Sequence, residues 1–356
     1  MPDERDMDQS KTFGDISSLD ELNRVNDAQK ATFAALLAAE GDALSERRQS
    51  AYLIRWLEGL AHVGYDTTLL DIGGGWPVGR VWATVILAHR TNYHLLDIDG
   101  AIIADARRRL PEYGLPAGNA NIGINTVLPY EANMFDVVFS SHCLEHSPNL
   151  PQTLSEIFRV LKPNGKLVFA VPFGFDDSDE HLICLDVDNW IAATEMAGFD
   201  VLNYHLGKTY VMAGWDPFVL AQRKSEQPDT QALRALTSRY TKAGRTFVAP
   251  GSSLFQYSGN IVESGSHRVL NGAGSAVIVT PPRPVDGVLF LRHNFSGVVE
   301  ITAGQQSQLC DLYSHIPYVQ LVATADAASE VKVRVIGRSR GSEQAVLHGV
   351  LLAPSA

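Results

Sequence analysis

The spacing of apolar positions changes along the chain, and each change predicts a different kind of element. Residues 18–40 and 45–64 carry apolar side chains at helical spacing, and Ser18 with Glu21 has the spacing of a capping box. Residues 1–17 lack such a pattern, so we expect a mobile tail there. N-terminal helices are therefore predicted ahead of the first strand.

From residue 68 onward, short apolar runs alternate with helical segments. This alternation predicts an α/β, Rossmann-like domain with a doubly wound, mostly parallel sheet. The expected strands are 68–73, 93–99, 135–142, 166–173 and 200–207, and the expected helices are 78–90, 100–114, 150–165 and 186–199. Pro111 predicts the end of one helix, and the pair Asn164-Gly165 predicts the C-cap of another.

The last third of the chain follows a different pattern. Residues 224–245 are polar and indicate a linker that holds a short helix. Helical periodicity then disappears, and short strand candidates separated by turn residues follow, which is typical of a small antiparallel β-sandwich. We therefore expect an α/β domain over 18–223 and an all-β sandwich domain over 246–356.

Composition narrows the class of protein. Hydrophobic residues make up 45% of the 356 positions, which is enough for packed cores, and the formal net charge of −11 disfavours a nucleic-acid partner. The acidic N-terminus does not resemble a signal peptide, and no apolar run approaches the roughly 20 residues of a membrane span. The three cysteines are widely separated and indicate neither a disulfide framework nor a zinc cluster. We expect a cytoplasmic protein.

The stretch LLDIGGGWP, residues 69–77, carries the first chemical signal. A strand that ends in a glycine turn and opens a helix is a nucleotide-binding geometry, because glycine lets the backbone approach a ligand closely. The dinucleotide pattern is incomplete, since Val78 occupies its third glycine position, and the Asp71 carboxylate would repel a pyrophosphate. These residues disfavour a nicotinamide cofactor and favour a cationic ligand.

The motif resembles the D-x-G-x-G motif of class I S-adenosylmethionine-dependent methyltransferases. Residues 128–173 are similar to the region around strands four and five in small-molecule methyltransferases of the ubiquinone-biosynthesis type. The resemblance covers roughly residues 67–204 and implies S-adenosyl-L-methionine as cofactor. It places the cofactor against Asp71, Gly73 and Gly75, the ribose hydroxyls on Asp97, and the adenine beside Ile98.

Two further positions complete the expected cofactor site. The family often carries an acid before the LPY segment that meets the adenine amino group, whereas this sequence reads IGINTV there. Asn125 replaces it through its side-chain oxygen, or backbone groups make the contact instead. Ser140 lies where the strand at 135–142 ends and is also expected near the cofactor.

Candidate catalytic side chains follow that strand in SSHCLEH, residues 140–146. His142 is expected at the carboxyl edge of the sheet and His146 one helical turn further on, so either could act as a general base. The alternative is that they cap a helix, bond a neighbouring loop or hold the methionine end of the cofactor. A second alternative is a divalent metal, because His142, Glu145 and His146 with the more distant His181 would suit a transition metal better than magnesium.

These observations predict an enzyme that moves a methyl group to a hydroxyl or amine of a small molecule, sugar or glycan. The alternative function is a binding or assembly protein that holds the cofactor without turnover, with the β-sandwich making the functional contacts. The sandwich resembles no family here, and its options are to bind a glycosylated acceptor, to close the site or to form a homodimer.

Overall fold

The computed structural model describes residues 10–14, 21, 24, 27–28, 30–31, 63–75, 83–208 and 215–355. The described residues of the predicted helix 18–40 that lie between 21 and 31 are helical. The predicted helix 45–64 falls outside the described residues up to position 62. Of the predicted helix 78–90, the described part contains the π-helix η2, Ala83–Ala88. Among the described residues, no helix has the length and apolar character to cross a membrane.

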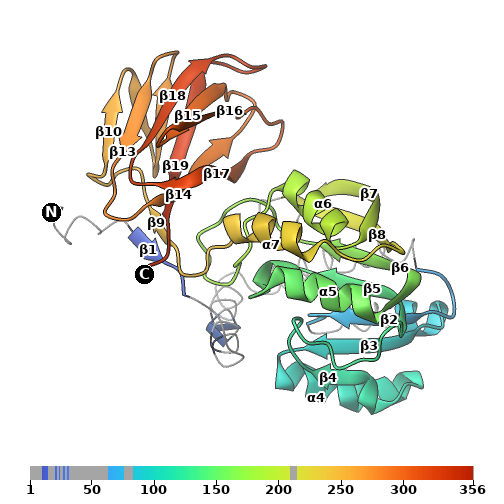
Figure 1. Cartoon of the computed structure of the whole chain (residues 1–356). Helices are drawn as coiled ribbons and strands as arrows, with labels where there is room; N and C mark the ends of the chain where they lie inside the picture. Colours follow the sequence, from blue (N-terminus) through green and yellow to red (C-terminus); the bar gives the residue numbers. More distant parts are fainter. Residues whose placement is uncertain are drawn as a thin grey trace.

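The first domain is built on a mixed seven-stranded sheet with the order β4-β3-β2-β5-β6-β8-β7 (Figure 1). Neighbouring strands run parallel from β4 to β6, and β8 pairs antiparallel with both β6 and β7. The strands are β2 Thr68–Ile72, β3 Asn92–Asp97, β4 Ala120–Ile122, β5 Phe135–Ser141, β6 Leu161–Ala170, β7 Phe199–Lys208 and β8 Trp215–Arg223. The predicted α/β class is confirmed, although the short β4 and the whole of β8 were not foreseen.

Helices cover both faces of this sheet, as the alternating pattern predicted. One core contains α5 (Leu150–Val160) and α6 (Val187–Met196), and the other contains η2 and α4 (Gly100–Arg109). The N-cap residues of α4, α5 and α6 are Asp99, Asn149 and Asp186, and each of these side chains accepts a hydrogen bond from a backbone N–H of the first turn. These caps fix where each helix starts after its strand, and hence the positions of the loops at the carboxyl edge of the sheet.

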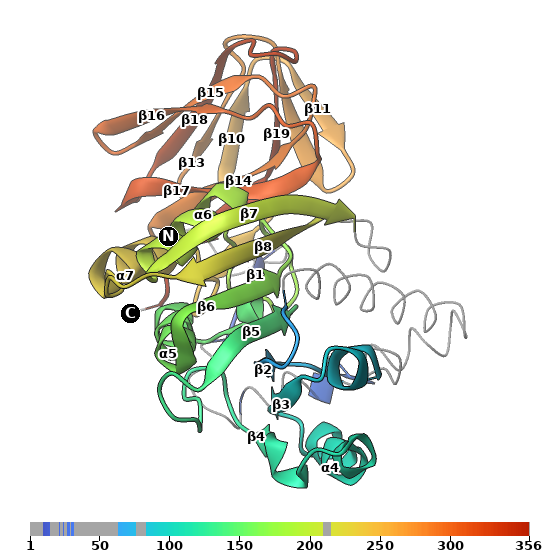
Figure 2. The same cartoon turned by 90° about the vertical axis from the view of Figure 1, so that its right-hand side faces the viewer.

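The C-terminal part of the chain folds into two antiparallel sheets around one apolar core (Figures 1 and 2). Along β18 every second residue is buried, the alternation expected for a strand with one face on a core. One sheet contains β1 Ser10–Thr12, β9 Thr246–Val248, β11 Ile261–Ser264, β12 His267–Asn271, β14 Val285–Arg292, β17 Tyr318–Ala328 and β19 Gln344–Leu352. The other contains β10 Phe255–Ser258, β13 Ala276–Val279, β15 Val298–Ala303, β16 Gln306–Asp311 and β18 Val331–Gly337.

The tail predicted over residues 1–17 is wrong where the structure describes it. Ser10–Thr12 forms β1, which pairs antiparallel with β9, and the following Phe13 is 2% exposed. The sequence pattern missed this strand because a three-residue strand shows no periodicity of its own.

The predicted linker over 224–245 is also wrong. The short helix expected there is present as α7, Thr230–Arg239, but its Leu233 is fully buried in the same core as α5 and α6. Lys242 is fully buried as well. The segment is therefore part of the packed structure.

The predicted C-cap at Asn164-Gly165 is displaced. Helix α5 ends at Val160, and Leu161 already begins β6. Asn164 does adopt the left-handed backbone conformation, with φ of 62°, but it does so within the span of β6. The pair therefore marks a turn at the strand's start instead of a helix end.

The two domains share an apolar interface. Its buried residues come from the N-terminal segment, the loop after β6 and the C-terminal sheet, namely Phe13, Phe175, Cys184, Leu289, Leu321 and Leu351. The backbone makes the contact close: the Phe175 N–H donates to the Val319 carbonyl over 2.7 Å, and a Cβ on Gly174 would lie 2.4 Å from that oxygen. The loop that leaves β6 is thus held by the sandwich.

Candidate functional site

The glycine turn after β2 has the conformation that the motif predicts. Gly73 and Gly75 have φ values of 69° and 59°, a region that residues with a Cβ rarely adopt. A Cβ on Gly73 would lie 2.5 Å from the Cys143 Sγ, whereas one on Gly75 would meet no atom of the described residues within 4 Å. Within the described part of the chain, the turn is therefore packed against the segment after β5 at Gly73 and open at Gly75.

Asp71 lies inside this turn and is fully buried on β2. Its Oδ2 accepts a hydrogen bond of 2.7 Å from the Tyr93 hydroxyl on the neighbouring strand β3. A Cβ on Gly74 would lie 2.4 Å from the same oxygen, so glycine is required there for the carboxylate to fit. Asp71 thus places a negative charge directly beneath the turn.

Asp97 ends β3 beside Gly75. Its Oδ2 accepts the Gly75 N–H over 3.1 Å, and its Oδ1 accepts the Asp99 N–H over 2.8 Å. Burial raises the pKa of this carboxyl group against the lowering effect of the two backbone hydrogen bonds and of Lys30. Lys30 is held at this edge of the sheet because its Nζ lies 2.5 Å from an Asp99 carboxylate oxygen.

These residues fit the cofactor that the sequence predicts. Each carboxylate oxygen accepts through more than one lone pair, so Asp97 keeps acceptor capacity for two hydroxyl groups after its two backbone bonds. The open space at Gly75 lies next to that carboxylate. The negative charges of Asp71 and Asp97 suit a ligand that carries a sulfonium and an ammonium group.

The three other residues predicted to line the cofactor site lie around the carboxyl edge of the sheet and make different contacts. Ile98 is half-buried and packs with Ile124 against Leu182. Asn125 is buried, and its side-chain oxygen accepts the Thr153 hydroxyl over 3.1 Å, so that oxygen already has a partner. Ser140 is fully buried and donates to the Ile72 carbonyl over 3.3 Å, which ties β5 to β2.

The predicted catalytic histidines meet at one carboxylate. The Nδ1 of His142 lies 3.5 Å and the Nε2 of His146 lies 3.6 Å from the Glu145 Oε1. The segment Leu144–His146 is a single 3-10 turn, so the predicted helical turn between the two histidines is wrong. The left-handed backbone of His142, with φ of 53°, brings both rings to Glu145 instead.

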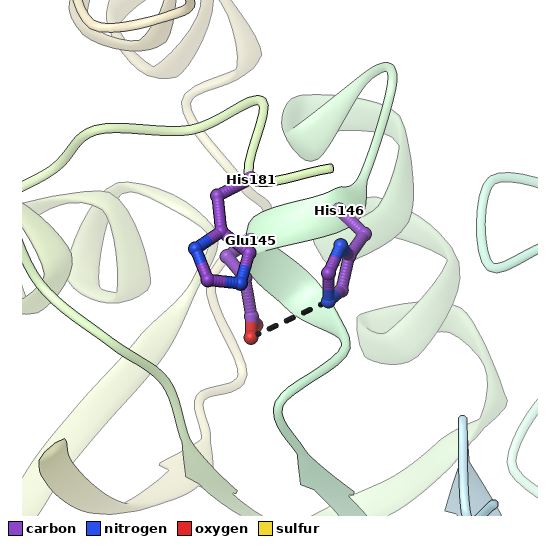
Figure 3. A group of neighbouring side chains, drawn as sticks. All are labelled: Glu145, His146 and His181. Atoms are coloured by element: carbon purple, nitrogen blue, oxygen red, sulfur yellow. Dashed lines mark ion pairs between the residues drawn. The ribbon is translucent and has the colours of Figure 1, made fainter. Parts of the chain in front are cut away.

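His181 joins this group from the loop after β6 (Figure 3). The ligand atoms of Glu145, His146 and His181 all lie within 4.8 Å of one another. His142 is not part of that set. The structure therefore brings together three of the four residues that the metal alternative named, and their roles in the chain stay predictions.

Asp176 and Lys242 are the functional neighbours that sequence reasoning missed. Burial alone would lower the pKa of His181, but its hydrogen bond and charge interaction with Asp176 raise that pKa above the usual value. Lys242 lies 3.2 Å from the same Asp176 carboxylate. The sequence offered only an acidic run at 176–180, typical of a solvated loop, and nothing in it indicates that a lysine more than sixty residues later reaches that run.

The pKa of the His146 imidazole shifts in the opposite direction from that of His181. Burial is the main cause that lowers the pKa of its imidazole, and its Nδ1 lies 2.8 Å from the Glu180 carbonyl oxygen. A carbonyl only accepts hydrogen bonds, so the ring carries its proton on Nδ1 and presents the Nε2 lone pair to Glu145.

Comparisons with known proteins found matches to the first domain. Residues 70–169 match the family described as "Methyltransferase domain". Phosphoethanolamine N-methyltransferase 2 of Caenorhabditis elegans is 33% identical over 104 residues, which are 29% of this chain and 23% of that protein. The ubiquinone/menaquinone biosynthesis C-methyltransferase UbiE of Brucella abortus (strain S19) is 30% identical over 119 residues, 33% of this chain and 43% of that protein. The chain thus spans less than half the length of these relatives.

A solved structure also aligns with part of this chain. The 1,6-didemethyltoxoflavin-N1-methyltransferase of Burkholderia thailandensis, solved with 1,6-didemethyltoxoflavin and S-adenosylhomocysteine, aligns with a TM-score of 0.46 and 18% identity. The alignment covers 59% of this chain and 92% of that one.

Proposed function

We propose that this chain is a class I S-adenosylmethionine-dependent methyltransferase, which transfers the methyl group of S-adenosylmethionine to a hydroxyl or amine of a small molecule or glycan; the match of residues 70–169 to the methyltransferase-domain family supports this. The observation that carries the proposal is the Asp97 carboxylate, which is fixed by two backbone N–H groups beside the open glycine turn. The matched relatives include an N- and a C-methyltransferase, so the choice of acceptor atom belongs to the proposal.

Asp97 would hold the ribose, and the glycine turn would let the backbone approach the cofactor. When bound, S-adenosylmethionine supplies a methyl group whose bond to the positively charged sulfur breaks with the electron pair left on sulfur. Asp71 and Asp97 favour binding of that positive charge through their own negative charges. Much of the rate enhancement in such a site comes from positioning the reactants.

His142 is the candidate base for the acceptor. Its side chain is 30% exposed, whereas Glu145 beside it is fully buried, so the imidazole is the group of this pair that an acceptor can reach. A neutral imidazole can take the proton that a hydroxyl or an amine must lose during the transfer. Glu145 would then stabilise the protonated ring from 3.5 Å.

The first prediction concerns Asp97. Asp97→Ala should weaken S-adenosylmethionine binding by about 1.5–3 kcal/mol, because hydrogen bonds from the ligand to a charged group are lost. Calorimetry measures the change, and Asp66→Ala, which alters an exposed ion pair with Arg90, is the matched control. Equal affinities in the Asp97→Ala and unmodified chains would remove Asp97 from the site, and preferential binding of NAD would contradict the proposed cofactor.

The alternative function is tested by turnover. A chain that only holds the cofactor releases no S-adenosylhomocysteine with any acceptor, whereas a methyltransferase releases it with at least one. The assay measures S-adenosylhomocysteine released with each compound of an acceptor panel. The panel should contain hydroxyl, amine and carbon acceptors and glycans, so that the acceptor atom is identified together with the activity.

A further inference from the structure

We propose that Glu145, His146 and His181 bind a divalent transition-metal ion beside the proposed cofactor site. The three side chains come from two segments, the 3-10 turn after β5 and the loop between β6 and α6. Figure 3 shows them converging, and their ligand atoms lie within 4.8 Å of one another.

Glu145 provides the first argument. Its side chain is fully buried, and neither carboxylate oxygen accepts a hydrogen bond from any residue that the structure describes. Its charged-pair neighbours are the imidazole nitrogens of His142 and His146, at 3.5 and 3.6 Å, too far for hydrogen bonds. A buried carboxylate without hydrogen bonds is costly, and a bound cation removes that cost.

The orientation of His146 provides the second argument. Because its Nδ1 donates to the Glu180 carbonyl, its Nε2 lone pair faces the Glu145 Oε1 across 3.6 Å. Two lone pairs at that distance repel each other unless a positive charge lies between them. Two ligands that each lie about 2.0–2.2 Å from one tetrahedral metal are about 3.3–3.6 Å apart, which includes the observed distance.

The support around His181 provides the third argument. Its Nδ1 is bonded to the Asp176 carboxylate, which leaves Nε2 as the nitrogen available to a ligand. Metal-binding histidines characteristically donate the other ring N–H to a carboxylate or a backbone carbonyl. His181 and His146 show these two arrangements, and the fully buried Lys242 fixes Asp176 through its carboxylate and its carbonyl.

The donor set selects the class of metal. Two imidazoles and one carboxylate suit Zn²⁺, Co²⁺ or Fe²⁺, whereas Mg²⁺ and Ca²⁺ prefer all-oxygen sites. Three protein ligands leave a position open on a tetrahedral ion. If the proposed function holds, that position would take the acceptor oxygen next to His142, where the metal would lower the pKa of a hydroxyl group.

The test is Zn²⁺ binding to the full chain after treatment with a chelator, followed by calorimetry. Binding of one ion per chain is expected, and Co²⁺ in the same site should give visible absorption bands. Glu145→Gln keeps the side-chain shape and should weaken Zn²⁺ binding about 100-fold or more, as should His181→Ala if the first variant does not fold. Asp176→Asn should weaken it about 10- to 100-fold, because it supports His181 without touching the ion.

His267→Ala is the matched control. The His267 Nε2 lies 3.0 Å from the Nδ1 of another histidine, His348, and both residues are far from the cluster in sequence. Zn²⁺ affinity should be unchanged in this variant. Failure of the unmodified chain to bind Zn²⁺, or equal binding by the Glu145→Gln chain, would overturn the proposal. So would loss of the ion in His267→Ala. Cofactor calorimetry on the metal-free chain separates this result from the proposed function, because Asp97 does not belong to the metal cluster.

Discussion

The buried His94 links the stability of this fold to pH. His94 on β3 is 7% exposed and packs its ring edge-on against Tyr130 and Phe135, and its Nε2 has no hydrogen-bond partner among the residues that the structure describes. Burial lowers the pKa of His94 to about 4. The neutral ring is therefore a condition for the packing between the two aromatic side chains.

Stability should consequently fall on acidification. Between the unfolded pKa of about 6.5 and the folded value of about 4, the unfolded chain binds more protons, so protonation favours unfolding. We expect the free energy of unfolding to drop by about 1–2 kcal/mol through this group between pH 7 and pH 5. Urea denaturation at both pH values should show a smaller drop for His94→Phe, and an equal drop would contradict the assignment. His348, whose pKa burial also lowers to about 4, contributes in the same direction.

Local motifs predicted the glycine turn and the acids beside it, whereas the contacts around His181 are long-range and were not predicted. Asp71 lies on β2, Gly73 follows that strand and Asp97 ends β3, so parallel pairing alone brings them together. The bond between His181 and Asp176 depends on a loop conformation that is fixed by Lys242. No pattern of polar and apolar positions encodes that contact.

At the scale of elements, predictions succeeded where apolar runs were long. β2, β3, β5 and β6 overlap their predicted ranges. The strand candidates of the sandwich overlap β12, β13, β14, β15, β17, β18 and β19; they are residues 267–272, 275–282, 287–293, 296–304, 318–325, 330–338 and 345–353. β16 was missed because its residues are mostly exposed at a sheet edge. The short helix predicted within 224–245 is α7, but its place in the core of the first domain was missed because a polar composition concealed one apolar face.

Helix α7 allows the corrected boundary to be tested. Leu233→Ala should lower the free energy of unfolding by about 2–5 kcal/mol, since Leu233 is fully buried in the core of the first domain. Leu309→Ala is the control, because Leu309 is 69% exposed and its loss should change stability by less than about 0.5 kcal/mol. Thermal or urea unfolding measures both. Equal small effects would restore the interpretation of this segment as a linker.

At the scale of the whole molecule, the two domains are joined through the N-terminal segment. The Phe13 ring lies 6.1 Å from the Phe175 ring and 4.7 Å from the Lys242 ammonium group, and both neighbours belong to segments outside the β-sandwich. β1, immediately before Phe13, is part of the sandwich sheet. One short stretch therefore contacts both domains.

Phe13→Ala should lower the free energy of unfolding by about 3–5 kcal/mol, the usual cost of removing a buried phenylalanine side chain. Phe295→Ala is the matched control, because Phe295 is 61% exposed and its loss should have little effect. Differential scanning calorimetry measures both variants. A Phe13→Ala chain as stable as the unmodified one would mean that the N-terminal segment does not contribute to the interface.

The pairing of β1 with β9 also sets an order of events on the ribosome. Thr12 bonds to Thr246, a partner 234 positions later in the chain. At about 5–20 residues per second, the nascent chain carries β1 without its partner strand for roughly 10–50 s. The parallel sheet of the first domain emerges within that interval, so its strands can pair while Phe13 is still unburied. Pairing of β1 is therefore a late step of synthesis, although its residues are made before those of the parallel sheet.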